Sequence, residues 1–173
     1  TNEGGYDNTY RFLKNIMGLW MISSIKREFN GESYVKGMDA SKHCIVEKGG
    51  KKLDFPDIIE MAKEADKGDC DFLVNADDSR FLAPNSMIDE IKTACAEGGH
   101  KVPESPGEIA LCVYKSLAVS YKRAIANLEK ITGRNYTSIN IIGGGCQDMY
   151  LNQQTANTCM LPVYAGPIEG TCI

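Results

Sequence analysis

The stretch TSINIIGGGCQDMYLN, residues 137–152, decides the fold of this chain. Residues 138–142 alternate and then run apolar, which predicts a mostly buried β-strand. Three glycines follow at 143–145, and from Gln147 the pattern is helical. Because glycine has no Cβ and a helix amino end has free N–H groups, a ligand could approach this turn closely. Spacing alone does not distinguish such a ligand loop from a tight turn that binds nothing.

The helix that is expected after the glycines begins with an acidic residue. Asp148 stands in its first turn, where the helix dipole favours a carboxylate. The same charge would repel a phosphate, so the uncharged part of a nucleotide is the favoured ligand there. Met149 and Leu151 are expected to face the interior.

The composition is that of a soluble globular protein, with 43% hydrophobic and 24% charged residues in 173. This length suits one domain with a substantial core. The net charge of -4 and a pI near 5.2 show no basic face of the kind that binds nucleic acid. We expect no membrane association, because no apolar run approaches the roughly 20 residues of a membrane helix and no signal peptide is seen. The first residue is Thr1 and not Met, which suggests a processed, cut or excised chain.

Cysteine is unusually frequent and odd in number. The seven positions are Cys44, Cys70, Cys95, Cys112, Cys146, Cys159 and Cys172. The absence of any CxxC pair argues against a zinc site, and the wide spacing favours an intracellular, cytoplasmic protein with mostly free, buried thiols. Cys95 and Cys112 flank a short connection between two expected helices, so they are a possible disulfide.

The amino-terminal part is expected to be a polar, turn-rich lead-in over 1–8 and a long helix from Thr9. Apolar residues recur there at intervals of three and four, which defines one stripe. These are Phe12, Leu13, Ile16, Met17, Trp20, Met21 and Ile25. Asn15 borders the stripe, where a carboxamide either caps a neighbour or holds a ligand, and the residues alone favour the cap. Gly18 would lie inside this helix and could allow a close approach by another element or a ligand.

The middle of the chain reads as short elements between polar loops. A glycine-rich surface excursion is expected over 30–52, a helix over 55–65 with Pro56 in its first turn, a strand-like run over 72–74 and a helix over 84–97. The adjacent Asp77 and Asp78 could suggest a metal or acid–base site, but turn chemistry is the favoured interpretation.

A helix from Pro106 to about Thr132 has the strongest local signal. Ser105 is its expected N-cap, Glu108 completes a capping box, and Gly133 ends it. After the glycine turn and its helix, residues 161–164 predict a short strand, 165–167 a turn, and 168–173 the start of a further helix.

This order of elements predicts an α/β domain in which the strands near 140 and 163 are parallel and joined through the helix near 150. Ligands of such sheets bind beyond the carboxyl ends of the strands. That rule favours a ligand at residues 143–145.

Six segments together resemble the carboxyl-terminal half of the FGGY carbohydrate kinases. They are TNEGG (1–5), RFLKNIMGLW (11–20), DDSRFLAP (77–84), VPESPGEIALC (102–112), INIIGGGCQDMYLNQQTAN (139–157) and PVYAGPIEGT (162–171). The resemblance covers nearly the whole chain in the right order and is strongest to members that act on L-rhamnulose. The exception is about 30–54, which we expect to be a surface insertion.

The resemblance implies an actin-like ATPase fold with ribonuclease-H-like domains, in which residues 1–173 form part of the carboxyl-terminal, nucleotide-side domain. The family enzyme transfers the γ-phosphoryl group of ATP, with Mg²⁺, to the 1-hydroxyl of L-rhamnulose. By this pattern the sugar site, the catalytic aspartate and a Gly-Thr phosphate turn precede Thr1, and a last helix follows Ile173. The chain alone is therefore expected to be inactive, with the amino-terminal domain of the same protein as its partner.

The resemblance also implies nucleotide-binding residues. Gly144, between Gly143 and Gly145, matches the adenosine-binding loop, and Asn15 matches a nucleotide-contacting asparagine. Ser23 stands where these kinases tend to have a glutamine, and the shorter side chain would need a bridging water. No residue of this chain matches a catalytic or metal-binding position.

Two other functions stay open. The chain could belong to another FGGY kinase that acts on L-fuculose, a pentulose or a signalling sugar, because substrate choice lies in the other half. It could also be a non-catalytic nucleotide-binding module of the actin-like superfamily, which an upstream aspartate and Gly-Thr turn would argue against. A purely structural helical domain is disfavoured by the strand–glycine–helix order.

Overall fold

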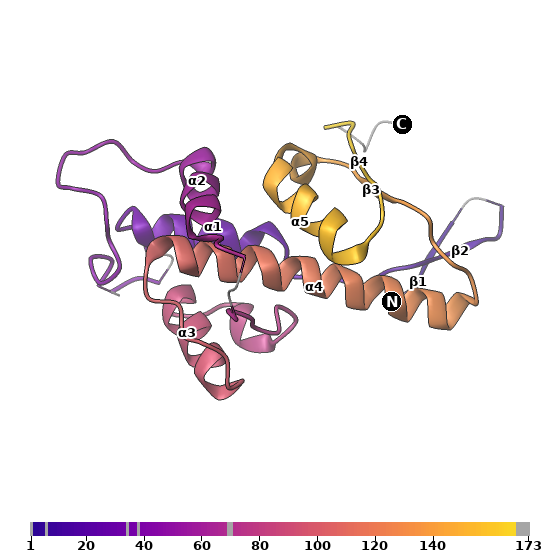
Figure 1. Cartoon of the computed structure of the whole chain (residues 1–173), viewed down its shortest axis with the longest axis horizontal. Helices are drawn as coiled ribbons and strands as arrows, with labels where there is room; N and C mark the ends of the chain where they lie inside the picture. The colour runs from indigo at the N-terminus through magenta and orange to yellow at the C-terminus, as the bar shows by residue number, and fades with distance from the viewer. Residues whose placement is uncertain (1, 6, 34, 38, 69–70, 169–173) are drawn as a thin grey trace. The chain divides into compact units, whose positions relative to one another are not determined.

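The computed structural model describes residues 2–5, 7–33, 35–37, 39–68 and 71–168. The chain divides into two compact units, which are described separately below. The middle unit is Met17–Leu117, and the terminal unit combines Thr1–Ile16 with Ala118–Ile173. Figure 1 labels the elements of both.

The middle unit is built from helices. They are α1 (Leu19–Phe29), α2 (Phe55–Ala65), the 3-10 turn η1 (Ser79–Phe81), α3 (Met87–Glu97) and the first part of α4 (Pro106–Thr132). α3 packs against both α1 and η1. Apolar side chains from every helix are buried and form the core. They include Met21, Ile22, Ile25, Phe29, Ile58, Phe81, Ile88, Ile91, Leu111, Tyr114 and Leu117.

The first helix begins ten residues later than the sequence predicts. Gly18 precedes α1 with φ 55 and ψ -145, a backbone conformation that ends the helical run and suits glycine. The interpretation of Gly18 as a helix-interior residue, and of a helix from Thr9, is therefore wrong. Of the residues in the apolar stripe, only Met21 and Ile25 are buried in the core, while Phe12 and Leu13 are exposed.

The other helices of the middle unit begin where capping residues place them. α2 has the predicted bounds, with Asp54 and Asp57 forming a capping box. α3 begins at Met87, three residues after the predicted start, because the Ser86 hydroxyl accepts a hydrogen bond from the Asp89 N–H group. Between α1 and α2 the described residues form turns and no helix, as the glycine-rich sequence predicts.

The capping box of α4 is confirmed. The Glu108 carboxylate accepts from the Ser105 N–H group at 2.9 Å, and the Ser105 hydroxyl accepts from the Glu108 N–H group at 3.2 Å. The helix runs to Thr132, where Gly133 follows with φ 66, as predicted. Residues 72–74 are not a strand, because the Val74 N–H group donates to the Ser116 hydroxyl of α4 and not to a neighbouring strand.

The terminal unit contains two small sheets. β1 (Asn2–Gly4) pairs antiparallel with β2 (Tyr10–Phe12), where the sequence predicts a lead-in and a helix. Asp7 and Asn8 adopt φ values of 54 and 55 in the connection, and such short polar side chains tolerate the left-handed turn that a hairpin needs.

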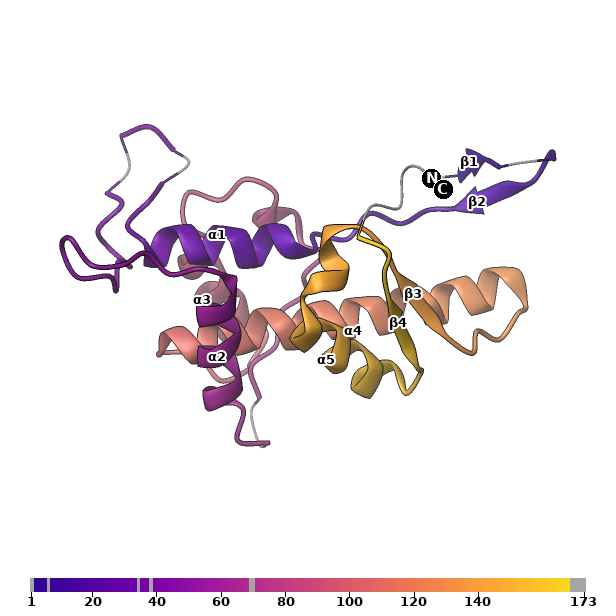
Figure 2. The ribbon, with the colours of Figure 1, turned by 90° about the horizontal axis from the view of Figure 1, so that it is seen from above.

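The second sheet carries the stretch that decides the fold. β3 (Ile139–Ile141) pairs parallel with β4 (Val163–Ala165), and they are joined through the 3-10 turn η2 (Gly144–Gln147) and α5 (Met149–Cys159). Figures 1 and 2 both show α5 beside these strands. A helix-rich α/β chain with a small parallel sheet is thus confirmed.

One sequence expectation for this unit is wrong, and another concerns residues that the structure mostly does not describe. Leu151 is buried as expected, but Met149 is 67% exposed because the first turn of α5 turns that side chain outward. The helix expected over 168–173 lies almost entirely outside the described residues. In the described part of the chain, no helix has both the length and the apolar character needed to cross a membrane.

Candidate functional site

Two turns meet at the carboxyl ends of the parallel strands β3 and β4. The Gly166 N–H group donates to the Ile141 carbonyl oxygen at 2.8 Å, and the Gly143 N–H group donates to the Pro167 carbonyl oxygen at 3.0 Å. These bonds extend the pairing of the strands into the turns that follow them. Residues 143–145 therefore stand at the edge of the sheet where ligands of α/β proteins bind.

The three glycines serve different purposes in this turn. Gly143 has φ 79 and ψ -165, a backbone conformation that a residue with a Cβ adopts only with strain. Gly144 is exposed, and apart from its chain neighbours and its own turn no heavy atom of the described residues lies within 4 Å of where a Cβ would stand. The Gly145 carbonyl oxygen accepts a hydrogen bond from the Asp148 N–H group at 3.3 Å. Gly143 is thus required by the backbone, whereas the space at Gly144 is free for a ligand.

Asp148 is the N-cap of α5, at the amino end that the sequence predicts. Its side chain is 8% exposed, and its Oδ1 atom accepts from the Leu151 N–H group at 2.9 Å. Burial raises the pKa of Tyr121, and the nearby negative charge of Asp148 raises this pKa further. The negative carboxylate lies at the base of the turn, which favours an uncharged ligand group there.

A buried asparagine that sequence reasoning missed holds the turn in place. The Asn152 side chain is 4% exposed, and its Nδ2 group donates to the Cys146 carbonyl oxygen at 2.9 Å. Within the described part of this unit, its Oδ1 atom has no hydrogen-bond partner, and the same is true of the buried hydroxyl groups of Thr155 and Ser120. The available signal was a second polar side chain one helical turn after Asp148.

Asn15 lies in the same unit but on a different kind of segment from the one predicted. It is exposed, in irregular backbone between β2 and Gly18, and not beside the apolar stripe of a helix. Among the described residues, no hydrogen bond joins Asn15 to residues 143–145. No described residue forms a hydrogen bond with its carboxamide, which leaves this group available to a ligand.

Ser23 belongs to the middle unit, where it is half-buried on α1. It borders a hollow of about 630 Å³ that several basic side chains line. Three of these are paired with carboxylates, since Lys26 lies 3.1 Å from Asp54, and Lys52 and Arg27 lie 2.5 and 4.0 Å from Glu32. The hollow is therefore less positive than its lysines suggest.

Cys95 and Cys112 are brought together on α3 and α4. Their Sγ atoms lie 3.7 Å apart, both side chains are fully buried, and neither forms a disulfide in this structure. A hydrogen bond with Cys112 lowers the pKa of the Cys95 thiol, with a further bond to the Leu73 carbonyl oxygen. A disulfide between them stays a prediction.

The acidic pair Asp77 and Asp78 forms a turn, as predicted. Asp78 caps η1 by accepting from the Arg80 N–H group at 3.0 Å, and the Asn75 side chain accepts from the Asp77 N–H group. In the described ranges, no three His, Cys, Asp or Glu side chains gather as metal ligands do.

The whole chain is similar in sequence to one family of known proteins. The description "FGGY family of carbohydrate kinases, C-terminal domain" matches residues 1–173. The chain is 45% identical over 174 residues to a rhamnulokinase of Oceanobacillus iheyensis, covering 100% of this chain and 32% of that protein. Rhamnulokinases of Halalkalibacterium halodurans and Klebsiella pneumoniae (strain ATCC 700721 / MGH 78578) are 41% and 38% identical over 173 residues, again over 100% of this chain. The chain spans about a third of the length of these relatives.

Proposed function

Because the chain belongs to the FGGY family of carbohydrate kinases, we propose that it forms the nucleotide-side part of an ATP-dependent sugar kinase. In this proposal the fold is the actin-like one, and the parallel strands β3 and β4 belong to its sheet. The observation that carries the proposal is the open glycine turn at the carboxyl ends of these strands.

The turn fits the uncharged part of ATP. Gly144 leaves room for a flat ring or a ribose to lie against the backbone, and the carboxylate of Asp148 disfavours phosphate at the same point. Asn15 supplies a carboxamide that can donate to or accept from the nucleotide. Ser23 would contact it through a water, as its short side chain requires.

Mg²⁺ is the expected companion of ATP in phosphoryl transfer, where it neutralises charge on the phosphates. The described residues gather no metal-ligating group, so we assign the ion no ligand within them. The described residues would instead hold the base and sugar of the nucleotide, so that the phosphates extend toward the other part of the enzyme. Positioning of this kind supplies much of the catalysis in phosphoryl transfer.

We propose L-rhamnulose as the phosphate acceptor, with the 1-hydroxyl as the group that is phosphorylated. Support comes from the relatives, which bear the name rhamnulokinase and are 38–45% identical across the whole chain. In this proposal the sugar and the base that accepts its proton are held by the remainder of the kinase. The 173-residue chain alone is then inactive as a kinase.

A coupled ADP-release assay tests the proposal on the full-length protein. L-rhamnulose, L-fuculose, L-ribulose and D-xylulose are offered at equal concentration. The expected result is turnover with a clear preference for L-rhamnulose. Turnover with only another ketose would keep the family function and reject this substrate, and no turnover with any of the four would favour a non-catalytic nucleotide-binding module.

A further inference from the structure

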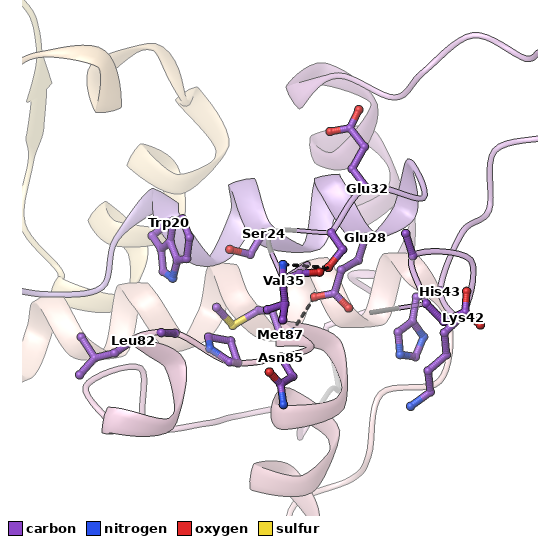
Figure 3. Close-up of a pocket in the computed structure, with 15 residues that line it drawn as sticks. Trp20, Ser24, Glu28, Glu32, Val35, Lys42, His43, Leu82, Asn85 and Met87 are labelled. Atoms are coloured by element: carbon purple, nitrogen blue, oxygen red, sulfur yellow. Dashed lines mark hydrogen bonds between the residues drawn. The ribbon is translucent and has the colours of Figure 1, made fainter. Parts of the chain in front are cut away.

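A cavity of about 310 Å³ lies in the middle unit, and none of the residues assigned to the nucleotide lines it. It opens between α1, the loop that follows α1, and the segment that leads into α3 (Figure 3). Its volume is at the lower end of the range of small-molecule sites. Nothing in the proposed kinase reaction uses it.

The inner wall of the cavity is apolar and contains an aromatic ring. Trp20, Leu82, Pro84 and Met87 line it. The indole Nε1 group of Trp20 donates to the Phe81 carbonyl oxygen at 3.1 Å, which fixes the position of the ring. Leu82 is 63% exposed, and a ligand in the cavity would partly cover it.

One buried polar group in this wall has no partner. The Ser24 side chain is 3% exposed, and its hydroxyl makes no hydrogen bond with the described residues. Ser24 lies one helical turn after Trp20 on the same side of α1 (Figure 3). A buried hydroxyl usually finds a partner, so this group is an exception in the wall of the cavity.

The rim of the cavity has an excess of negative charge. The Glu28 carboxylate accepts 2.6 Å bonds from the Ser86 hydroxyl and the Met87 N–H group, both of which are neutral donors. Asp39 is likewise bonded to neutral groups, at 2.6 and 2.9 Å from the hydroxyl and N–H group of Ser41. The hydroxyl bond, with the N–H bond second, lowers the pKa of Asp39, so this carboxylate is ionised at neutral pH.

The basic groups at the rim do not balance these carboxylates. Lys42 forms a salt bridge with Asp89, and the His43 Nε2 atom lies 2.9 Å from the other oxygen of Asp89. The third rim carboxylate, Glu32, is paired with Lys52 at 2.5 Å. Among the described residues, no salt bridge joins Glu28 or Asp39 to a basic group.

We propose that this cavity binds a small organic cation, with an aromatic or aliphatic body and an ammonium group. The body packs against Trp20 and Leu82, where burial of apolar surface favours binding. The ammonium group faces Glu28 and Asp39. The carboxylates attract an ammonium group through their opposite charge, and an indole face also attracts a cation that lies near it.

The single tryptophan of the chain reports directly on this site. Trp20 is the only one in 173 residues, so a change in tryptophan fluorescence comes from the cavity wall. The probe is 2-phenylethylammonium, titrated into the 173-residue chain at neutral pH. The matched probes are 2-phenylethanol, which lacks the charge, and 3-phenylpropionate, which reverses it. The expected result is a saturable change with the ammonium compound and at least twofold weaker binding of both analogues.

Two variants test whether the rim carboxylates bind the ammonium group without changing the fold. Asp39→Asn removes an exposed charge, and Glu28→Gln keeps an acceptor for the Met87 N–H group while removing the charge. Each is expected to weaken binding of the ammonium probe by about twofold to fivefold, the range of a solvent-accessible ion pair. Glu47→Gln is the matched control, because Glu47 is exposed in the same loop and does not line the cavity.

The proposal fails on any of three results. These are the absence of a saturable change with the ammonium probe, equal affinity for 2-phenylethanol, or unchanged affinity in Asp39→Asn. Circular dichroism of each variant confirms that it is folded. If Glu28→Gln loses structure, Asp39→Asn alone decides, since its side chain is exposed and its loss does not disturb the core.

Discussion

The side-chain amide of Asn152 donates a hydrogen bond to the carbonyl oxygen of Cys146 at 2.9 Å. This bond joins α5 to the turn η2 that follows Gly143. In Asn152→Asp the shape is kept, but a carboxylate faces the carbonyl oxygen and cannot donate to it. We expect the free energy of unfolding to fall by about 1–3 kcal/mol, the cost of leaving a buried polar group unsatisfied, as measured by urea denaturation.

Asn157→Asp is the matched control for this change. Asn157 is exposed on the same helix, and its Oδ1 atom accepts from the Gln153 side chain at 2.8 Å, which an aspartate can still do. Equal stability of the two variants would contradict the role of the bond between Asn152 and Cys146.

Substitutions at Gly143 and Gly144 distinguish a glycine that the fold needs from one that the ligand needs. Gly144→Ala places a methyl group in open space, so the stability of the chain should change little. In the full-length kinase the same methyl group would occupy the space proposed for adenosine, so KM for ATP should rise by about tenfold, or roughly 1.4 kcal/mol of binding. Thermal denaturation of the chain and ADP-release kinetics of the kinase measure the two effects.

Gly143→Ala is expected to behave in the opposite way. Its φ of 79 strains any residue with a Cβ, so the free energy of unfolding should fall by about 1–2 kcal/mol. If Gly144→Ala left KM for ATP unchanged, the nucleotide would not lie against this turn.

The sequence predicts best where local signals act alone. The capping box of Ser105 and Glu108 and the stop at Gly133 predicted α4, because these signals depend only on residues within one helical turn. The pairing of β3 with β4 followed from the order strand, glycine turn, helix and strand.

The sequence-based prediction was wrong for a segment whose apolar spacing fits either one long helix or a strand followed by a helix. Phe12 and Leu13 fit a helical stripe with Trp20 and Met21, but Gly18 has φ 55 and separates a strand from a helix. Spacing cannot show which solution is adopted, since that depends on the hairpin partner. Asn152 was missed for a related reason, because its partner is a backbone carbonyl that only the folded turn presents.

The predicted disulfide between Cys95 and Cys112 can be tested by oxidation. Their Sγ atoms are 3.7 Å apart, and the hydrogen bond from Cys112 lowers the pKa of Cys95, which favours the thiolate that begins oxidation. We expect diamide to form the bond slowly, because both thiols are buried. Intact mass under denaturing conditions should then be lower by two hydrogen atoms. Cys112→Ser should abolish this loss and Cys44→Ser should not; an unchanged mass in the parent chain would exclude the disulfide.

Glu108 should make the stability of the chain depend on pH. The N–H group of Ser105, with that of Glu104, holds the pKa of Glu108 below its ordinary value near 4.5. A carboxylate with a lowered pKa in the folded chain stabilises it fully above the unfolded value, and this contribution is lost as pH falls through the folded value. Between pH 6 and pH 3, urea denaturation should therefore show a smaller fall in stability for Glu108→Gln than for the parent chain. Glu104→Gln, an exposed neighbour, should retain the pH dependence of the parent chain. At pH 7, Glu108→Ala should lower the free energy of unfolding by about 1 kcal/mol, as for loss of a helix cap.

The pH prediction has a clear contradicting outcome. If Glu108→Gln and the parent chain lost stability in parallel down to pH 3, the carboxylate would not be the group that couples the start of α4 to pH.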